Sequence, residues 1–144
     1  MRIGVLTGGG DCPGLNAAIR AIVRCATDDE VAVLGIRNGF RGLVENDVTE
    51  LTRTSVIGIL PRGGTILGTS RFNPLKDEAC TKLLKENFAM HGLDALVVVG
   101  GEGSLSAARD FAASSLTNFC CDSDSGPKSP AKVFGTSKQP RIAA

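Results

Sequence analysis

The segment covering residues 96–105 limits the folds open to this chain more than any other. Its sequence, LVVVGGEGSL, joins four apolar residues to a turn that holds three glycines and one carboxylate, Glu102. An uninterrupted apolar run is typical of a strand that is buried on both faces of a parallel sheet. The glycines permit a sharp turn, after which a helix can begin at Ser104. The segment therefore predicts an α/β fold.

The same turn predicts an anion site. Free N–H groups at the start of a helix bind phosphate, and here they lie above the end of a strand. Glu102 adds a hard oxygen ligand, which beside phosphate indicates a magnesium ion. In isolation, Glu102 is equally consistent with a solvated loop acid. The working hypothesis is a nucleotide-phosphate site at the carboxyl end of a strand.

The N-terminal part predicts one βαβ unit. Residues 2–6 (RIGVL) and 31–36 (VAVLGI) are strand candidates, and the glycine-rich stretch 8–16 with Asp11 follows the first of them. Taken alone, that stretch is as consistent with a tight βα connection as with a phosphate loop. Between the strands, apolar residues recur at helical spacing: Leu15, Ala18, Ile19, Ile22, Val23 and Ala26. Two strands joined by a helix predict a parallel sheet.

The middle of the chain contains a second glycine-rich loop. Residues 38–43 (NGFRGL) indicate a loop with an exposed aromatic candidate, Phe40, whereas residues 56–60 are too short to distinguish helix from strand. Residues 61–71 (PRGGTILGTSR) combine glycines, hydroxyls and arginines, which is typical of an anion-binding loop. Arg71 is either a phosphate contact or an ordinary surface arginine.

Two further helices and one strand complete the recognisable pattern. A helix is predicted over 77–90 and ends at Gly92, a strand over 94–99 and a helix over 104–112. His91 follows the first helix and is expected to be solvated. The stripe expected to face the core on that first helix consists of Ala79, Leu83, Leu84 and Phe88.

The sequence changes character near residue 113. No helical or strand period persists through residues 113–144, so we expect this tail to be disordered or foreign to the fold. Residues 118–121 and 132–135 are strand possibilities that the pattern does not settle.

Composition excludes several classes of function. The 144 residues suit one domain, and 16 basic against 15 acidic residues give no indication of nucleic-acid binding. Apolar runs are too short to span a membrane, so we expect a cytoplasmic protein. The five cysteines lack CxxC spacing, and we expect them to be reduced and structural, with Cys12 as a packing residue. The sequence has no GxxxxGK[ST] motif, and its partial dinucleotide fingerprint lacks the third glycine.

Four motifs occur together in one order. They are RIGVLTGGGDCPGLNAAIR, NGFRGL, RGGTILGTSR and DALVVVGGEGSL, and their order and spacing resemble the ATP-dependent 6-phosphofructokinases, most closely the bacterial, actinomycete-like branch. The resemblance covers residues 1 to about 112. It implies the N-terminal ATP-binding part of a Rossmann-like, three-layer α/β domain. It also implies a glycolytic phosphotransferase that converts ATP and fructose 6-phosphate to ADP and fructose 1,6-bisphosphate, with Mg²⁺, allosteric control and homo-oligomers that are often tetramers.

The resemblance also implies roles for individual residues. Glu102 stands at the position of the magnesium ligand, where many relatives have aspartate, and Ala107 stands where a glycine often approaches the nucleotide. Gly103 favours ATP over pyrophosphate, because an aspartate there would crowd the outer phosphates. Arg20 and Arg24 match effector-site arginines, although a solvated helix face explains them equally well. The residues that the resemblance places against ATP are Gly9, Phe40, Arg71, Gly101, Gly103 and Ser104.

The catalytic base of the family is an aspartate in a TIDND-like motif, which this sequence lacks. We therefore expect an incomplete 6-phosphofructokinase chain without the base and most of the sugar site, and without catalysis of its own. The alternatives are a non-catalytic Mg-ATP-binding fragment and a pyrophosphate-dependent phosphofructokinase. A third alternative, a kinase of the GGDG type that acts on NAD or a lipid, would explain only the last loop, GGEGSL.

Overall fold

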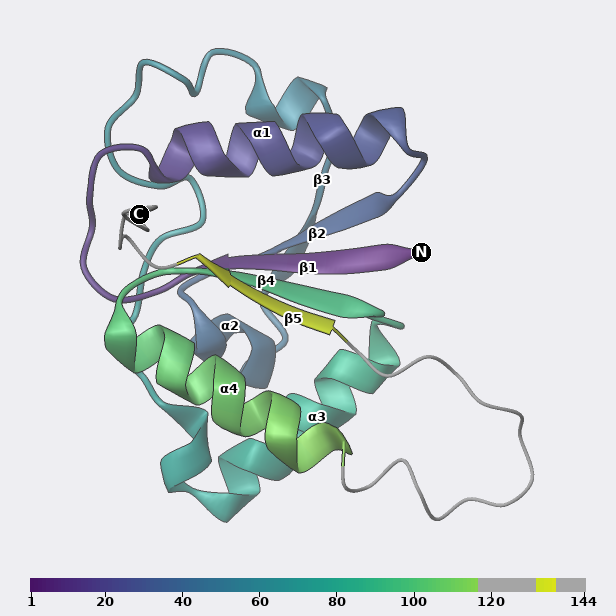
Figure 1. Cartoon of the computed structure of the whole chain (residues 1–144), viewed down its shortest axis with the longest axis vertical. Helices are drawn as coiled ribbons and strands as arrows, with labels where there is room; N and C mark the ends of the chain where they lie inside the picture. The colour runs from purple at the N-terminus through teal and green to yellow at the C-terminus, as the bar shows by residue number, and fades with distance from the viewer. Residues whose placement is uncertain (117–131, 137–144) are drawn as a thin grey trace, which may run out of the picture.

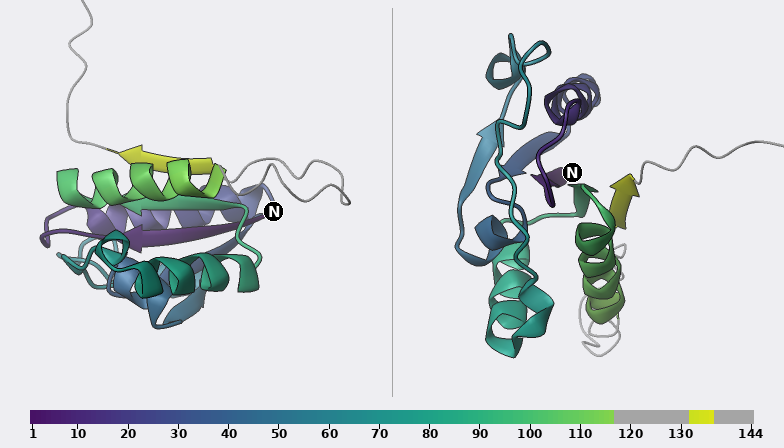
Figure 2. Two further views of the ribbon diagram at one scale, coloured as in Figure 1. Left: turned by 90° about the horizontal axis from the view of Figure 1, so that it is seen from below. Right: turned by 90° about the vertical axis from the view of Figure 1, so that its left-hand side faces the viewer.

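A computed structural model of the chain describes residues 1–116 and 132–136. One twisted sheet lies between two helical layers, with α1 on one face and α2, α3 and α4 on the other (Figures 1 and 2). The elements are β1 (Arg2–Thr7), α1 (Leu15–Asp28), β2 (Ala32–Ile36), α2 (Phe40–Val44), β3 (Val48–Leu51), the 3₁₀ turns η1 (Thr54–Val56) and η2 (Pro74–Lys76), α3 (Glu78–Met90), β4 (Ala95–Val99), α4 (Glu102–Leu116) and β5 (Lys132–Thr136). The expected α/β class and three-layer arrangement are confirmed.

The strand order is β3-β2-β1-β4-β5. Strand β1 is parallel to β2 and β4, so that Val5 pairs with Gly35 on one side and Val97 on the other. Strand β5 is parallel to β4. The expectation of a purely parallel sheet is wrong at β3, which is antiparallel to β2. The segment between β2 and β3 contains only the five-residue helix α2, and it is too short for the crossover that a parallel return requires.

Each face of the sheet supports its own hydrophobic core. Successive side chains of β1 point to opposite faces, so Val5 packs with Ile19 of α1 while Leu6 packs with Leu84 of α3. All four side chains are fully buried. The strand pattern and the helical period of α1 therefore agree about which residues face inward, and this agreement explains why the βαβ expectation is confirmed.

Helix α3 buries less of its surface than its periodicity predicts. The helix begins one residue late, because Asp77 is its N-cap and accepts a hydrogen bond from the backbone N–H of Ala79. Leu84 is fully buried, but Leu83 is 44% exposed and Ala79 is also exposed. Helix α2 and the turn η2 pack against α3, and Phe111 of α4 contacts Phe88, but Leu83 and Ala79 stay uncovered. The predicted stripe is therefore too wide.

The segments with weak sequence signals differ most from expectation. Strand β3 was not predicted, and residues 57–60 after η1 form turns rather than a helix or strand. Helix α4 begins at Glu102 instead of Ser104 and continues past residue 112 to Leu116. Strand β5 coincides with the strand candidate at 132–135. The candidate at 118–121 lies outside the described residues.

Two findings bear on the expectations drawn from composition. In the two described stretches, none of the helices has the length and apolar character needed to cross a bilayer. Cys12, Cys25 and Cys80 are free thiols. The Cys80 thiol donates a hydrogen bond to Asp77, and this bond, with burial and the negative charge of Asp77, raises the pKa of Cys80. Cys80 is therefore a poor nucleophile near neutral pH.

Candidate functional site

The loops after β1 and β4 meet because these strands are neighbours and end in register, Thr7 beside Val99. The N–H of Gly8 donates a 2.9 Å hydrogen bond to the Val99 carbonyl. The two loops pack so closely that a Cβ on Gly100 would lie 2.6 Å from the Gly8 carbonyl oxygen, and one on Gly8 would lie 2.4 Å from Ser104 Oγ. The clash at Gly100 is with backbone, so only glycine fits there, and the two loops form one close-packed junction.

The loop at 61–71 closes over the same junction. The buried hydroxyl of Thr7 donates to the Gly68 carbonyl at 2.7 Å and shares a 2.9 Å hydrogen bond with the hydroxyl of Thr65. The N–H of Gly9 donates to the Ser70 carbonyl at 3.2 Å. The three glycine-rich loops that the sequence singled out are therefore joined by hydrogen bonds at the carboxyl edge of the sheet.

Asn16, which is 2% exposed, anchors the start of this third loop. Its side-chain amide donates to the carbonyls of Arg62 at 3.1 Å and Gly63 at 3.4 Å, and its oxygen accepts from the N–H of Ile66 at 2.8 Å. We expect Asn16→Ala to lower the free energy of unfolding by about 2 kcal/mol, because buried polar groups lose their partners. The loop should also open locally, which would speed tryptic cleavage after Arg62.

Urea unfolding and limited proteolysis with trypsin measure these two effects. The exposed Glu86 of α3, whose carboxylate forms an ion pair with Lys82, provides the control variant Glu86→Ala. An Asn16→Ala protein with the stability and cleavage rate of this control would contradict the anchoring role.

The start of α4 presents unpaired backbone donors. The N–H groups of Ser104 and Leu105 both reach the Gly101 carbonyl at 3.1 Å, whereas those of Glu102 and Gly103 have no backbone acceptor in the described chain. The helix dipole adds partial positive charge at this end. The carboxylate of Glu102 is exposed beside these donors. The arrangement can hold an anion through the backbone and a cation through the carboxylate.

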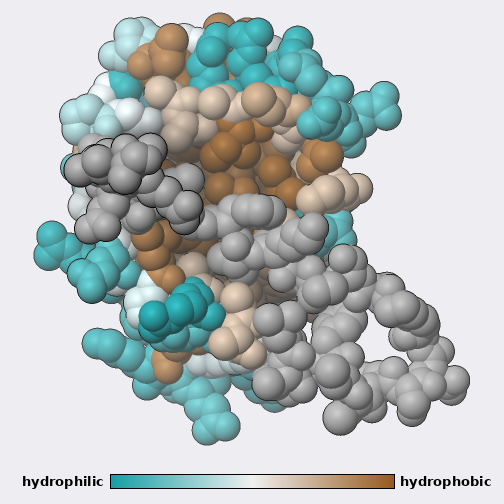
Figure 3. Space-filling model, viewed as in Figure 1, coloured by the Kyte–Doolittle hydropathy of each residue, from teal (hydrophilic) through white to brown (hydrophobic). Residues whose placement is uncertain are grey.

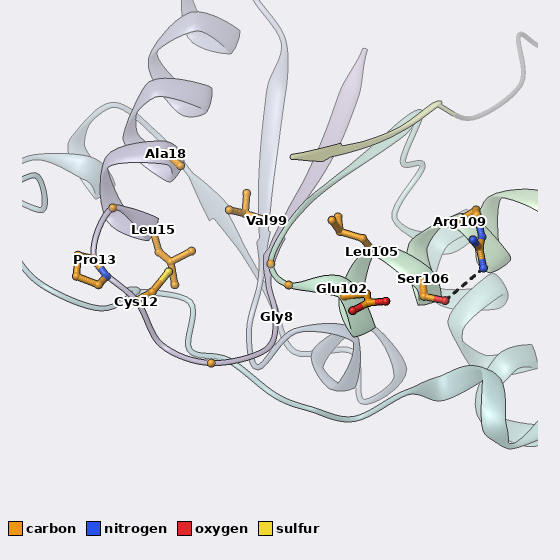
Figure 4. A pocket seen from close by; sticks show the side chains of 14 residues that line it. Gly8, Cys12, Pro13, Leu15, Ala18, Val99, Glu102, Leu105, Ser106 and Arg109 are labelled. Atoms are coloured by element: carbon orange, nitrogen blue, oxygen red, sulfur yellow. Dashed lines mark hydrogen bonds between the residues drawn. The ribbon is translucent and has the colours of Figure 1, made fainter. Parts of the chain in front are cut away.

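A cavity of about 1060 Å³ lies against this junction, between the start of α1 and the start of α4 (Figure 4). Leu15 and Ala18 line it from α1, and Leu105, Ser106 and Arg109 line it from α4. Among the described residues of its wall, Glu102 and Arg109 are the charged ones. Figure 3 shows apolar residues gathered between the two helical layers on the face seen in Figure 1, with hydrophilic residues around them.

The structure brings five of the expected ligand positions together. Gly101 and Glu102 line the cavity, and a Cβ built on the neighbouring Gly103 would meet no atom within 4 Å. Gly9 has a φ of 84°, and a Cβ there would lie 3.5 Å from the Gly101 nitrogen and 3.9 Å from Ser104 Oγ. Gly9, Gly103 and Ser104 lie next to the cavity but are not on its wall. The loop after β1 lines the wall with Gly8, Gly10, Cys12, Pro13 and Gly14.

Three positions lie elsewhere. The expectation of an exposed Phe40 is wrong, because its ring is 3% exposed and packs in the core beneath the sheet with Leu6 and Ile36. Ala107, 2% exposed, packs in that same core. Arg71 is exposed, and within the described stretches it has neither a hydrogen bond nor an ion pair and does not line the cavity.

The structure places Arg20 and Arg24 together on a second cavity of about 260 Å³. Arg53 joins them there, although the sequence analysis did not select it. It also pairs with Asp28 at the end of α1. A separation of some thirty residues leaves no local pattern that connects Arg53 to the helix, and only the packing of η1 against α1 brings it close.

The Phosphofructokinase family model matches residues 2–123. The chain belongs to the phosphofructokinase family. Two curated relatives, the ATP-dependent 6-phosphofructokinases of Photobacterium profundum and Pectobacterium carotovorum, are 50% and 51% identical to this chain over 108 residues, which is 75% of this chain and 34% of each relative. The pyrophosphate–fructose 6-phosphate 1-phosphotransferase of Streptomyces coelicolor is 50% identical over 113 residues, 78% of this chain and 33% of that relative.

Solved structures agree with the family. The T-state phosphofructokinase of Pichia pastoris superposes with a TM-score of 0.81 at 32% identity, covering 93% of this chain and 14% of that one. The pyrophosphate-dependent phosphofructokinase of Marinobacter aquaeolei gives a TM-score of 0.75 at 17% identity over 94% and 33%, and it supports the fold alone. The chain spans about a third of the length of the curated relatives that it matches.

Proposed function

We propose that this chain binds Mg-ATP in the cavity at the start of α4. It would supply the phosphoryl-donor side of the 6-phosphofructokinase reaction, in which ATP and fructose 6-phosphate give ADP and fructose 1,6-bisphosphate. The observation that carries the proposal is the exposed carboxylate of Glu102 on the cavity wall, next to the unpaired N–H groups of Glu102 and Gly103. Phosphate and magnesium need this combination of backbone donors and a hard oxygen ligand.

The donor set fits magnesium that arrives with a nucleotide. No cluster of three or more His, Cys, Asp or Glu side chains occurs in the stretches that the structure describes. A site that must hold the bare ion is therefore not supported, but magnesium commonly binds through one or two carboxylates together with substrate phosphates and water. Glu102 would hold the metal, and the metal would neutralise charge on the phosphates.

The neighbouring residues would bind and orient the donor. Gly9, Gly101 and Gly103 allow close approach of phosphate to the backbone, and Ser104 belongs to the same junction. The exposed Arg71 is free to contact phosphate from the third loop. A nucleotide contact by Phe40 stays a prediction from the family resemblance, since the ring is buried in the core.

Phosphoryl transfer depends mainly on positioning and charge neutralisation, with a base that orients the accepting hydroxyl. No TIDND-like motif that would supply this base occurs in the sequence. We therefore expect the 144-residue chain with Mg-ATP and fructose 6-phosphate to form no fructose 1,6-bisphosphate, measured by a coupled aldolase assay. Product formation at a rate that scales with the concentration of the purified chain would contradict the expectation that this chain binds the donor but lacks the catalytic base.

Pyrophosphate is the second candidate donor, favoured by the Streptomyces coelicolor relative at 50% identity. Gly103 favours ATP, because the absence of a side chain leaves room for the outer phosphates. Competition separates the two donors. If stoichiometric Mg-pyrophosphate displaces Mg-ATP, and Mg-ATP does not displace Mg-pyrophosphate, then pyrophosphate rather than ATP is the donor.

The second cavity supports a regulatory proposal. Arg20, Arg24 and Arg53 give it a concentration of positive charge that suits an anionic effector, a role that the family resemblance implies for Arg20 and Arg24. Homo-oligomers, a cytoplasmic location and the division of the chain at residue 112 also stay predictions.

A further inference from the structure

The donor cavity contains a cation for which neither the sequence nor the family resemblance gave a role. Arg109 lies on its wall, seven residues after Glu102 on α4. Every other described residue of the wall is neutral or, in the case of Glu102, acidic. A polyphosphate carries several negative charges, and its binding in a partly apolar cavity needs compensation from more than helix N–H groups.

The side chain of Arg109 is already turned toward the start of the helix. Its Nη2 donates a 3.4 Å hydrogen bond to Ser106 Oγ, which also lines the cavity (Figure 4). Ser106 follows Glu102 by four residues, and residues four apart are neighbours on one face of a helix. The hydroxyl of Ser106 therefore holds the guanidinium about one helical turn from the proposed magnesium ligand.

The remaining contacts of Arg109 leave it available to a ligand. Its Nε donates to Asp110 Oδ1 at 3.1 Å, in an ion pair whose side chains are 77% and 53% exposed. Exposed ion pairs contribute little to stability, so a phosphate can replace this partner at small cost. The other N–H groups of the guanidinium have no partner in the described part of the chain. Their planar arrangement matches two oxygens of one phosphate.

We propose that Arg109 is a phosphate-binding residue of the donor site, held in position by Ser106. It contacts a phosphate oxygen of the polyphosphate on the α4 side of the cavity and acts as a second positive charge beside the metal. This inference rests on the proposed donor site, and it assigns the contact to phosphate rather than to the nucleoside.

Titration calorimetry of the 144-residue chain with Mg-ATP and with Mg-pyrophosphate tests the inference. We expect Arg109→Ala to weaken both ligands by about 10-fold, the loss typical of a hydrogen bond to a charged group. Arg109→Lys, which retains the charge but not the planar fork, should recover part of the affinity. Lys82→Ala removes one positive charge from the exposed surface of α3 and serves as the matched control.

The outcomes separate this inference from the function on which it rests. Equal binding of both ligands by Arg109→Ala and Lys82→Ala, with binding lost in Glu102→Gln, would overturn the role of Arg109 and leave the donor site intact. Loss of Mg-ATP binding alone would place the guanidinium on the nucleoside and contradict the phosphate assignment. A wild-type chain that binds neither ligand would refute the donor site and, with it, this inference. Circular dichroism of each variant verifies that the exposed substitution leaves the fold unchanged.

Discussion

Gly42→Ala is expected to destabilise the chain by about 3 kcal/mol or more, the upper range for a substitution that forces backbone atoms apart. A Cβ at position 42 would lie 1.8 Å from the carbonyl oxygen of Arg37, at the turn that follows β2. Backbone cannot move aside as the end of a side chain can. Helix α2 must therefore shift, and with it Leu43, which is fully buried in the core beneath the sheet.

Gly63→Ala is the matched control for this substitution. A Cβ at Gly63 would meet no atom within 4 Å, and its φ lies outside the left-handed region. Its expected effect on the free energy of unfolding is within about 0.5 kcal/mol. Urea unfolding followed by circular dichroism compares the two variants. Equal stability of both would show that the turn between β2 and α2 is not packed as described.

Gly103→Asp is expected to reduce Mg-ATP binding by on the order of 100-fold. Two like charges about 6 Å apart at an effective dielectric constant of about 20 repel by about 3 kcal/mol, which corresponds to this loss of affinity for a carboxylate beside the outer phosphates. The substitution adds negative charge to the first turn of α4, where the helix dipole tolerates it, and the fold should persist.

Gly103→Ala separates the charge of the new side chain from its size. A Cβ there would meet no atom within 4 Å, so the alanine variant should bind Mg-ATP nearly as well as the wild-type chain. Calorimetry on both variants measures the difference. An aspartate variant that binds as tightly as the alanine variant would contradict the placement of the outer phosphates at Gly103.

The sequence predicted the part of the fold in which local pattern and tertiary packing agree. Strands β1 and β4 have apolar runs and helix α1 has a strong helical period, and their inward residues, such as Leu6, Ile19 and Leu96, are fully buried. Strand β3 was not predicted, because it has only four residues, VTEL, in which apolar and polar side chains alternate weakly. Phe40 was expected in an exposed loop, since nothing local indicates that a five-residue helix will press its ring into the core.

In the candidate site, too, the features that follow from local sequence were predicted and those that depend on tertiary packing were not. Parallel pairing of β1 with β4 made the meeting of their glycine loops predictable, and Glu102 at the start of α4 followed from the turn itself. The positions of Arg53 and Arg109 were not predictable. Each depends on which face of an element meets a cavity, and that depends on packing between distant segments.

We expect Glu102 to make nucleotide binding by this chain depend on magnesium. Calorimetry of the wild-type chain and of Glu102→Gln with ATP, each with Mg²⁺ and with EDTA, tests it directly. We predict saturable binding by the wild-type chain with Mg²⁺, at least 10-fold weaker binding in EDTA, and equally weak binding by Glu102→Gln in both conditions. ATP binding that is unaffected by EDTA and by the loss of the carboxylate would contradict a magnesium-binding role for Glu102.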